Sequence, residues 1–348
     1  MTLTTGSQFN RYSFINIHKA VVGIFRQKSQ GNAVILIIYA MLLKFSMFLY
    51  PRAPVRHPGD DHYLYIWLLD FLEPLKLAPT FYSFISFVIL YIQATLFNRI
   101  CNAQKMLPKP NFLPAMAYLL LTSLIPEWNY FSAPLLINLF LIWTFYRMTN
   151  LYNTQKPGAS IFNIGIIMGV VTLLYQPAIV FVILLLLALF IMRPFRIQEW
   201  LIGLLGVTLP YYFLLLVLYL GDNWHWQQML PTISFRLPTL PSSLIITLSI
   251  ALLVFPFVIG GLFVQNNLSK MLIQGRKNWS LLLLFLIMSM LIIVVNGGEN
   301  NYVNWALSIM PLAAFHAAAY YYPQKKLFPV IMHYIIFAFA LYVNYFQR

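Results

Sequence analysis

The chain has 348 residues, of which 61% are hydrophobic and only 9% are charged, and its formal net charge is +14. Soluble globular proteins carry roughly 25% charged residues, so this composition excludes an ordinary soluble domain. Apolar runs over 161–192 and 279–295 have the length that transmembrane helices need. The positive charge does not indicate nucleic-acid binding, because Lys and Arg lie at the ends of apolar segments and not in one basic patch. We therefore predict an integral membrane protein whose partner is membrane lipid and not nucleic acid.

The chain begins with a polar, basic segment, residues 1–31, which we expect on the cytoplasmic side. Its weakly amphipathic stretch 12–25 is expected to form an interfacial helix on the inner membrane surface. Residues 32–346 are expected to form a single transmembrane domain. Its predicted fold is all-α, a polytopic helix bundle of about 11 spans. The expected spans are 32–50, 80–98, 112–126, 131–147, 161–176, 177–192, 200–220, 242–264, 279–296, 304–322 and 327–346.

Two details of this threading depend on local chemistry. The run 161–192 is divided at Pro177, because proline lacks a backbone donor and disfavours helix at the preceding residue. The segment 51–79 is expected to be an external loop, in which 62–77 forms an amphipathic helix rich in Tyr and Trp, as is typical of a membrane interface.

The charges indicate an orientation. With the N-terminus inside, most Lys and Arg fall in cytoplasmic segments, whereas every acidic residue except Glu199 falls outside. Cytoplasmic loops of membrane proteins collect Lys and Arg, so the N-terminus is predicted to be cytoplasmic. Any chemistry that needs carboxylates is then expected at the external face.

Asp60 and Asp61 are the first candidates for such chemistry, since they follow the first expected span. Adjacent carboxylates repel each other and favour a cation, a proton or nearby bases. They could bind a divalent metal through oxygen, or one could act as a general base. Arg56, His57 and His62 flank them and could bind a substrate anion. The alternative is a solvated loop whose charges balance one another.

Three further residues are candidates in later external segments. Glu127, in the next expected external turn, is either a second carboxylate of the same pocket or a charge that stabilises a helix N-terminus. Arg236 is the best placed external cation for a lipid phosphate, or an interfacial anchor. Glu299 lies in a loop rich in Asn and Gly that suits either head-group hydrogen bonding or a plain turn. Walker, GxGxxG, HExxH, CxxC and GxSxG motifs are absent, which argues against the usual ATPases, dehydrogenases, zincins and serine hydrolases.

Three segments carry a family resemblance: FRQKSQGN (25–32), LIPEWNYFSAP (124–134) and RPFRIQEW (193–200). They resemble a family of uncharacterised bacterial multi-spanning membrane proteins. The resemblance covers most of the chain and implies a bacterial inner-membrane location without an established activity. Members are sometimes labelled carotene monooxygenases, a label that the chain's 6 scattered His do not support.

A second, distant resemblance is architectural and covers roughly the first 200 residues. The acidic pair in the first external loop, the amphipathic segment after it and the second acid in the next turn resemble the C-type (GT-C) glycosyltransferases. That resemblance implies sugar transfer from a polyprenyl-phosphate donor, with Asp60 or Asp61 as base or metal ligand. The sequence lacks a strict DxD motif and a large C-terminal external domain.

Three hypotheses on function follow. The first is a glycosyltransferase or related group transferase at the external face, with Asp60, Asp61 and Glu127 as catalytic residues. The second is a non-catalytic membrane component of an envelope secretion or polymer-export assembly. The third is a transporter, which is disfavoured because transporters usually show inverted repeats and no repeat is evident here.

Overall fold

The computed structural model of the chain describes residues 21–29, 31–152, 154–222, 243–295 and 302–346. The regular elements of this part are helices, which confirms the all-α prediction. In chain order they are α2 (Val21–Phe25), α3 (Gly31–Lys44), α4 (Ser46–Leu49), α5 (Tyr63–Leu72), η1 (Glu73–Leu75), α6 (Pro79–Ala103), α7 (Leu113–Leu121), η2 (Pro126–Asn129), α8 (Ala133–Thr149), α9 (Gly158–Leu174), η3 (Gln176–Ile179), α10 (Val180–Met192), α11 (Ile197–Leu220), α12 (Leu244–Asn267), η5 (Leu268–Lys270), α13 (Ile273–Val295), η6 (Val303–Ser308), α14 (Ile309–Tyr321) and α15 (Leu327–Tyr345).

Each predicted span contains a helix, but the prediction of about 11 membrane crossings is not supported. Within the described ranges, 5 helices are long and apolar enough to cross a membrane: α6, α11, α12 with the turn that follows it, α13 and α15. The others are shorter. The 9 residues of α7 extend only about 14 Å at 1.5 Å per residue, under half of a hydrocarbon core of about 30 Å. The apolar runs therefore predicted where helices form and overestimated how many cross.

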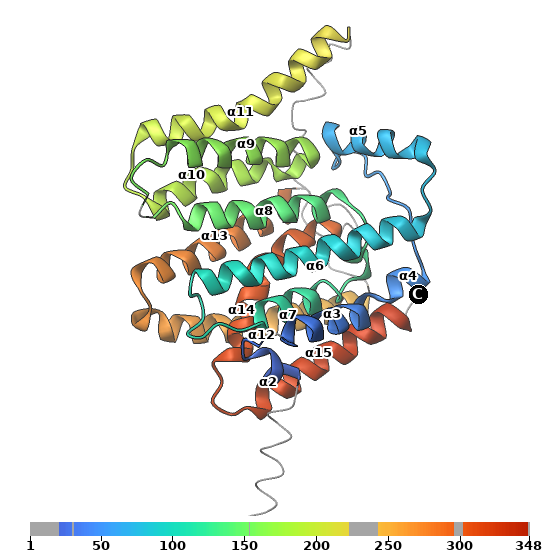
Figure 1. Cartoon of the computed structure of the whole chain (residues 1–348), viewed down its shortest axis with the longest axis vertical. Helices are drawn as coiled ribbons and strands as arrows, with labels where there is room; N and C mark the ends of the chain where they lie inside the picture. Colours follow the sequence, from blue (N-terminus) through green and yellow to red (C-terminus); the bar gives the residue numbers. More distant parts are fainter. Residues whose placement is uncertain (1–20, 30, 153, 223–242, 296–301, 347–348) are drawn as a thin grey trace, which may run out of the picture.

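Figure 1 shows the helices in rows that run back and forth between two ends of the molecule, with α11 and α15 on opposite sides of the stack. The α10–α11, α12–α13 and α14–α15 connections lie at the end drawn on the left. We call this the basic end, because these connections contain Arg193, Arg196, Lys270, Lys325 and Lys326. The opposite end holds α4, α5 and the end of α15. We call it the acidic end, because the α4–α5 connection contains Asp60 and Asp61.

Glycines bring α9 and α11 into close contact. A Cβ atom on Gly165 would lie 2.3 Å from the Gly203 carbonyl oxygen, and one on Gly206 would lie 2.4 Å from the Phe162 carbonyl oxygen. Small residues at such positions let helix backbones approach closely in membranes. This packing fixes α9, whose C-terminal end brings Leu174 to the turn that contains Asp60 and Asp61.

Candidate functional site

A tight turn over residues 57–62 positions the acidic pair. The backbone N–H groups of Asp60 and Asp61 both donate to the His57 carbonyl, at 3.1 and 3.0 Å. Gly59 has a φ of +92°, a left-handed conformation that favours glycine. These two hydrogen bonds fix the backbone of Asp60 and Asp61 in the turn.

The chain after the turn pairs with the α9–α10 connection. The His62 N–H donates to the Leu174 carbonyl at 3.2 Å, and the Gln176 N–H donates to the Asp60 carbonyl at 2.9 Å. Asp61 and Tyr175 are thereby held opposite each other in an isolated antiparallel bridge. Two segments more than one hundred residues apart in the chain meet here, at the acidic end.

The Asp61 carboxylate is enclosed, with only 3% of its side chain exposed. Its Oδ2 atom accepts a hydrogen bond of 2.7 Å from the His57 backbone N–H and lies 3.8 Å from His57 Nδ1. Burial raises the pKa of Asp61 to about 6, and the His57 contacts oppose that shift only in part. A carboxylate with such a pKa changes protonation state just below neutral pH, as a general base must be able to do.

Two buried polar atoms near Asp61 have no hydrogen-bond partner among the described residues: the Tyr65 hydroxyl and His62 Nδ1. Burial, and next the nearby Asp61 charge, raise the pKa of Tyr65, so the phenol stays protonated. Burial lowers the pKa of His62, so its ring is neutral at pH 7. Buried polar groups are normally paired, and these two are therefore available to a ligand or an ordered water.

Aromatic rings and the short helix η6 complete the surroundings of the 57–62 turn. The Tyr65 ring stacks on Phe131 with centroids 6.3 Å apart. On another side, the Tyr175 hydroxyl donates to Asn304 Oδ1 in η6. The same helical turn approaches η2, where Trp128 Nε1 donates to the Tyr302 carbonyl at 2.7 Å. Thus η6 lies between the turn that carries Asp61 and the helix η2 that carries Glu127.

Glu127 does not join the enclosed group. Its side chain is exposed, and it makes no hydrogen bond or ion pair with the residues that the structure describes. The predicted catalytic role of Glu127 therefore stays a prediction.

Arg56 faces α5 and η1 rather than the carboxylate pair. One of its guanidinium nitrogens lies 2.6 Å from an Asp70 oxygen and 2.8 Å from a Glu73 oxygen. Both ion pairs are well exposed, so they attach the 51–62 loop to α5 with little net energy. A cavity of about 290 Å³ adjoins Arg56, and Leu69 and Tyr82 line it too.

The remaining predicted residues are placed as follows. Arg236 and Glu299 lie outside the described residues. Among the described residues, no group of at least 3 His, Cys, Asp or Glu side chains could hold a metal ion. The metal-binding role predicted for Asp60 and Asp61 stays a prediction, and we derive no step through a metal.

Three residues of this group were not predicted from the sequence: Tyr65, Tyr175 and Asn304. Tyr175 precedes the Gln176-Pro177 break that divided the run 161–192, so its place at a helix end was visible without a reason to pair it with Asp61. No pattern in the sequence links Asn304 to either segment.

Comparisons with known proteins give a family and no function. The model of a family of unknown function (DUF6427) matches residues 63–347. The match begins at Tyr63, so the turn 57–62 lies outside it. A search of curated proteins found no match, and neither did a search of solved structures. Because the match covers most of the chain, this protein belongs to the DUF6427 family of unknown function.

Proposed function

We propose that this membrane protein is a group transferase of the glycosyltransferase kind, which acts at the external face on a polyprenyl-phosphate-linked donor. The observation that carries the proposal is the enclosed Asp61 carboxylate, whose pKa is raised to about 6 beside the unpaired Tyr65 hydroxyl. Enzymes place general bases in such surroundings because burial tunes the pKa toward the working pH.

In the proposed reaction, Asp61 removes the proton from a hydroxyl of the acceptor while that oxygen attacks the anomeric carbon of the donor sugar. The bond between that carbon and the phosphate oxygen breaks, and the polyprenyl phosphate leaves with the electron pair. Tyr65 and the neutral His62 ring would orient the acceptor through hydrogen bonds. Asp60 and Glu127 would support the charge balance, and Arg56 or Arg236 would contact the donor phosphate.

The enclosure of Asp61 adds a requirement to this proposal. A side chain that is 3% exposed cannot meet a substrate unless a neighbouring element moves. The element that would move is α5, since Tyr65 lies in it and most of its other residues are exposed or half-buried. Movements of short elements over an active site commonly admit substrate and then exclude water.

The proposed location is a bacterial inner membrane with the N-terminus in the cytoplasm. It is supported by the separation of charge between the two ends, because Lys and Arg collect on the cytoplasmic side of such membranes. The acidic end, with Asp61, would then face the periplasm.

A second candidate, a non-catalytic component of an envelope assembly, is favoured by the exposed apolar faces of α11 and α12. In each helix, only 22% of the residues in an apolar stretch of 18 are buried inside the protein. Lipid covers such faces in a membrane, but a partner subunit covers them equally well.

The test is complementation of a deletion strain of the native host by the wild type, Asp61→Asn, and Glu127→Gln. Lipid-linked saccharides and envelope polymers would be compared by mass spectrometry, with protein amounts checked by immunoblot. We expect Asp61→Asn to reproduce the deletion profile at normal protein amount, because the amide cannot accept the proton.

Wild-type saccharides in the Asp61→Asn strain would refute the general-base assignment. The second candidate, an assembly component, is favoured if the deletion changes no saccharide and a second protein subunit stays bound to the purified chain. Asp61→Asn should then leave that subunit bound.

A further inference from the structure

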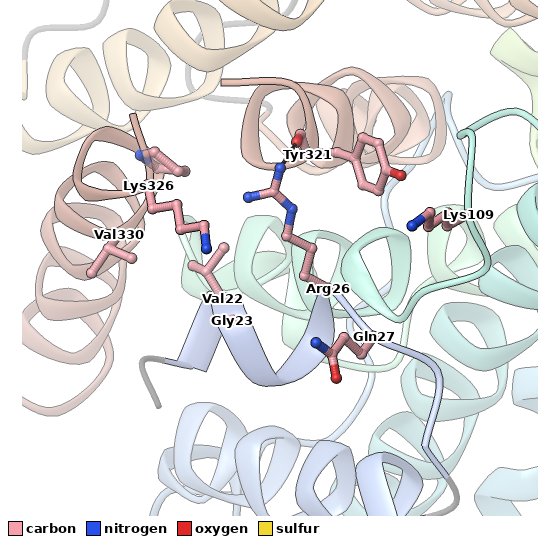
Figure 2. A pocket seen from close by; sticks show the side chains of 9 residues that line it. Val22, Gly23, Arg26, Gln27, Lys109, Tyr321, Lys326 and Val330 are labelled. Carbon is pink, nitrogen blue, oxygen red and sulfur yellow. Dashed lines mark hydrogen bonds between the residues drawn. The ribbon is translucent and has the colours of Figure 1, made fainter. Parts of the chain in front are cut away.

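A cavity of about 300 Å³ opens at the basic end, next to α2 (Figure 2). Segments far apart in the chain line it: α2 with the residues after it, the α6–α7 connection, and the region around the α14–α15 connection. Three cationic side chains, Arg26, Lys109 and Lys326, belong to this lining. In Figure 2 the Arg26 guanidinium lies between the Lys326 and Lys109 side chains.

Contacts with the rest of the protein fix the position of the Arg26 side chain and of α2. One guanidinium nitrogen donates to the Tyr321 carbonyl, and the group lies 5.4 Å from the centroid of the Tyr321 ring. The Phe112 N–H donates to the Phe25 carbonyl at 2.8 Å, which ties α2 to the connection that carries Lys109. An arginine has five N–H donors, so the bond to the Tyr321 carbonyl leaves others for a ligand.

The described lining of the cavity contains basic residues and no acidic one. The only acidic residue at the basic end within the described ranges, Glu199, pairs with Arg193 at 2.8 Å. Cations that converge in a hollow with low-dielectric walls create a strong local potential for an anion. Arg and Lys together are the usual partners of phosphate oxygens.

The cavity also has an apolar side, formed by Val22, Pro329 and Val330. Pro329 and Val330 belong to α15, one of the helices that are long and apolar enough to cross a membrane. A ligand that fits this lining carries a phosphate at one end and hydrocarbon at the other. Free phosphate would use only the cationic side.

We propose that this cavity binds the phosphate group of an anionic membrane lipid, with Arg26, Lys109 and Lys326 as the contacts. The site shares no residue with the group around Asp61, so it does not depend on the proposed transferase activity. In the predicted orientation it faces the cytoplasmic leaflet, where anionic lipids attract basic residues.

The test uses the purified full chain in a neutral detergent, with binding measured by thermophoresis. The probes are dioctanoyl phosphatidylglycerol, dioctanoyl phosphatidylcholine and inorganic phosphate. We expect the anionic lipid to bind at least about tenfold more tightly than the other two probes. The double variant Lys109→Gln/Lys326→Gln should weaken anionic-lipid binding by roughly 30-fold, since each basic residue near a membrane contributes about a factor of five.

The matched control is Lys156→Gln/Lys325→Gln, which removes the same charge from exposed positions of the same end that do not line the cavity. It should change binding by less than about threefold, because exposed charges are screened by salt. Both double variants keep Arg26 and its bond to Tyr321. If Lys109→Gln/Lys326→Gln does not fold, the single variant Lys109→Gln replaces it in the binding assay, because Lys109 is exposed. Equal binding of the two lipids, or equal losses in both double variants, would overturn the site. Inorganic phosphate that binds as tightly as the anionic lipid would overturn the lipid as its ligand.

Discussion

Replacing Asp61 by asparagine removes a buried charge and keeps the shape of the side chain. Burial raises the pKa of Asp61 to about 6 in the folded protein, against an ordinary value of 3.8. Since the folded protein binds this proton more tightly than the unfolded chain, ionisation of Asp61 opposes folding. The protonated Asp61 carboxyl favours the folded state. This contribution to stability is complete below about pH 4 and is lost as the pH rises through about 6. At pH 7.5 the ionised carboxylate costs about 3 kcal/mol of unfolding free energy, because each tenfold change in proton affinity is worth about 1.4 kcal/mol.

Asparagine does not carry this cost, and its oxygen can still accept the His57 N–H. Its NH₂ group needs a partner of its own, so we expect a net gain of about 1 to 3 kcal/mol at pH 7.5. Unfolding followed by tryptophan fluorescence in detergent should show a midpoint several degrees above the wild type at pH 7.5. The difference should shrink as the pH falls through about 6 and close below about pH 4, where the wild-type carboxyl is protonated in both the folded and the unfolded states.

Asp60→Asn is the control, because Asp60 is its sequence neighbour and is only half-buried. It should change the unfolding midpoint less than Asp61→Asn does at pH 7.5. A lower midpoint for Asp61→Asn at pH 7.5, or a gain that does not vary with pH, would refute the reasoning. A gain in stability joined to a loss of function would indicate that the charge is kept for activity, since functional sites commonly lower stability.

Three further substitutions, and one control, test the packing and the ion pairs. Gly260→Ala should lower the unfolding free energy by about 2 kcal/mol or more, because the new Cβ would lie 1.9 Å from the Phe315 carbonyl oxygen. A Cβ at the neighbouring Gly261 would meet no atom within 4 Å, so Gly261→Ala should be neutral in the same thermal unfolding assay. Arg56→Ala should lower stability by less than about 1 kcal/mol, and by still less in high salt, because its ion pairs are exposed. Glu199→Ala should cost about 3 kcal/mol by the same measurement, since it strands the largely buried Arg193 without its carboxylate.

The sequence predicted the helices well and the membrane crossings poorly. Every long apolar run became a helix, because in lipid only helices and closed barrels satisfy the backbone. Crossing, however, depends on length and on what covers the helix. The expected span 112–126 contains only the 9-residue helix α7, whose residues are all buried by other helices. A buried apolar helix and a lipid-facing one have the same composition, and hydropathy does not separate them.

The candidate site was predictable in part. Asp60, Asp61, His57 and His62 were found because they are adjacent in the sequence, and the structure keeps them together in one turn. The difference in burial between Asp60 and Asp61 depends on which of them faces Tyr175, and that register is set by a contact across more than one hundred residues. The substrate-binding role predicted for Arg56 stays a prediction. Its ion pairs with Asp70 in α5 and Glu73 at the start of η1 were not predictable, because they depend on how the 51–62 loop folds against the next helices.

Lys44 is fully buried, although it lies in the apolar helix α3. Helix α7 ends inside the protein, and carbonyl groups at a buried helix end need partners other than water. Asn344 Nδ2 donates to the Ser123 carbonyl at 2.6 Å, and the Ser249 hydroxyl donates to the Leu124 carbonyl at 3.0 Å.

Lys44 Nζ donates at 2.7 Å to the hydroxyl of Thr122, the C-cap residue of α7, and so brings a hydrogen-bond donor to that helix end. Side chains from α3, α12 and α15 thus converge on one buried helix end. The buried lysine thus has a structural reason: where a helix ends inside the protein, the surrounding helices supply the polar groups that water supplies elsewhere.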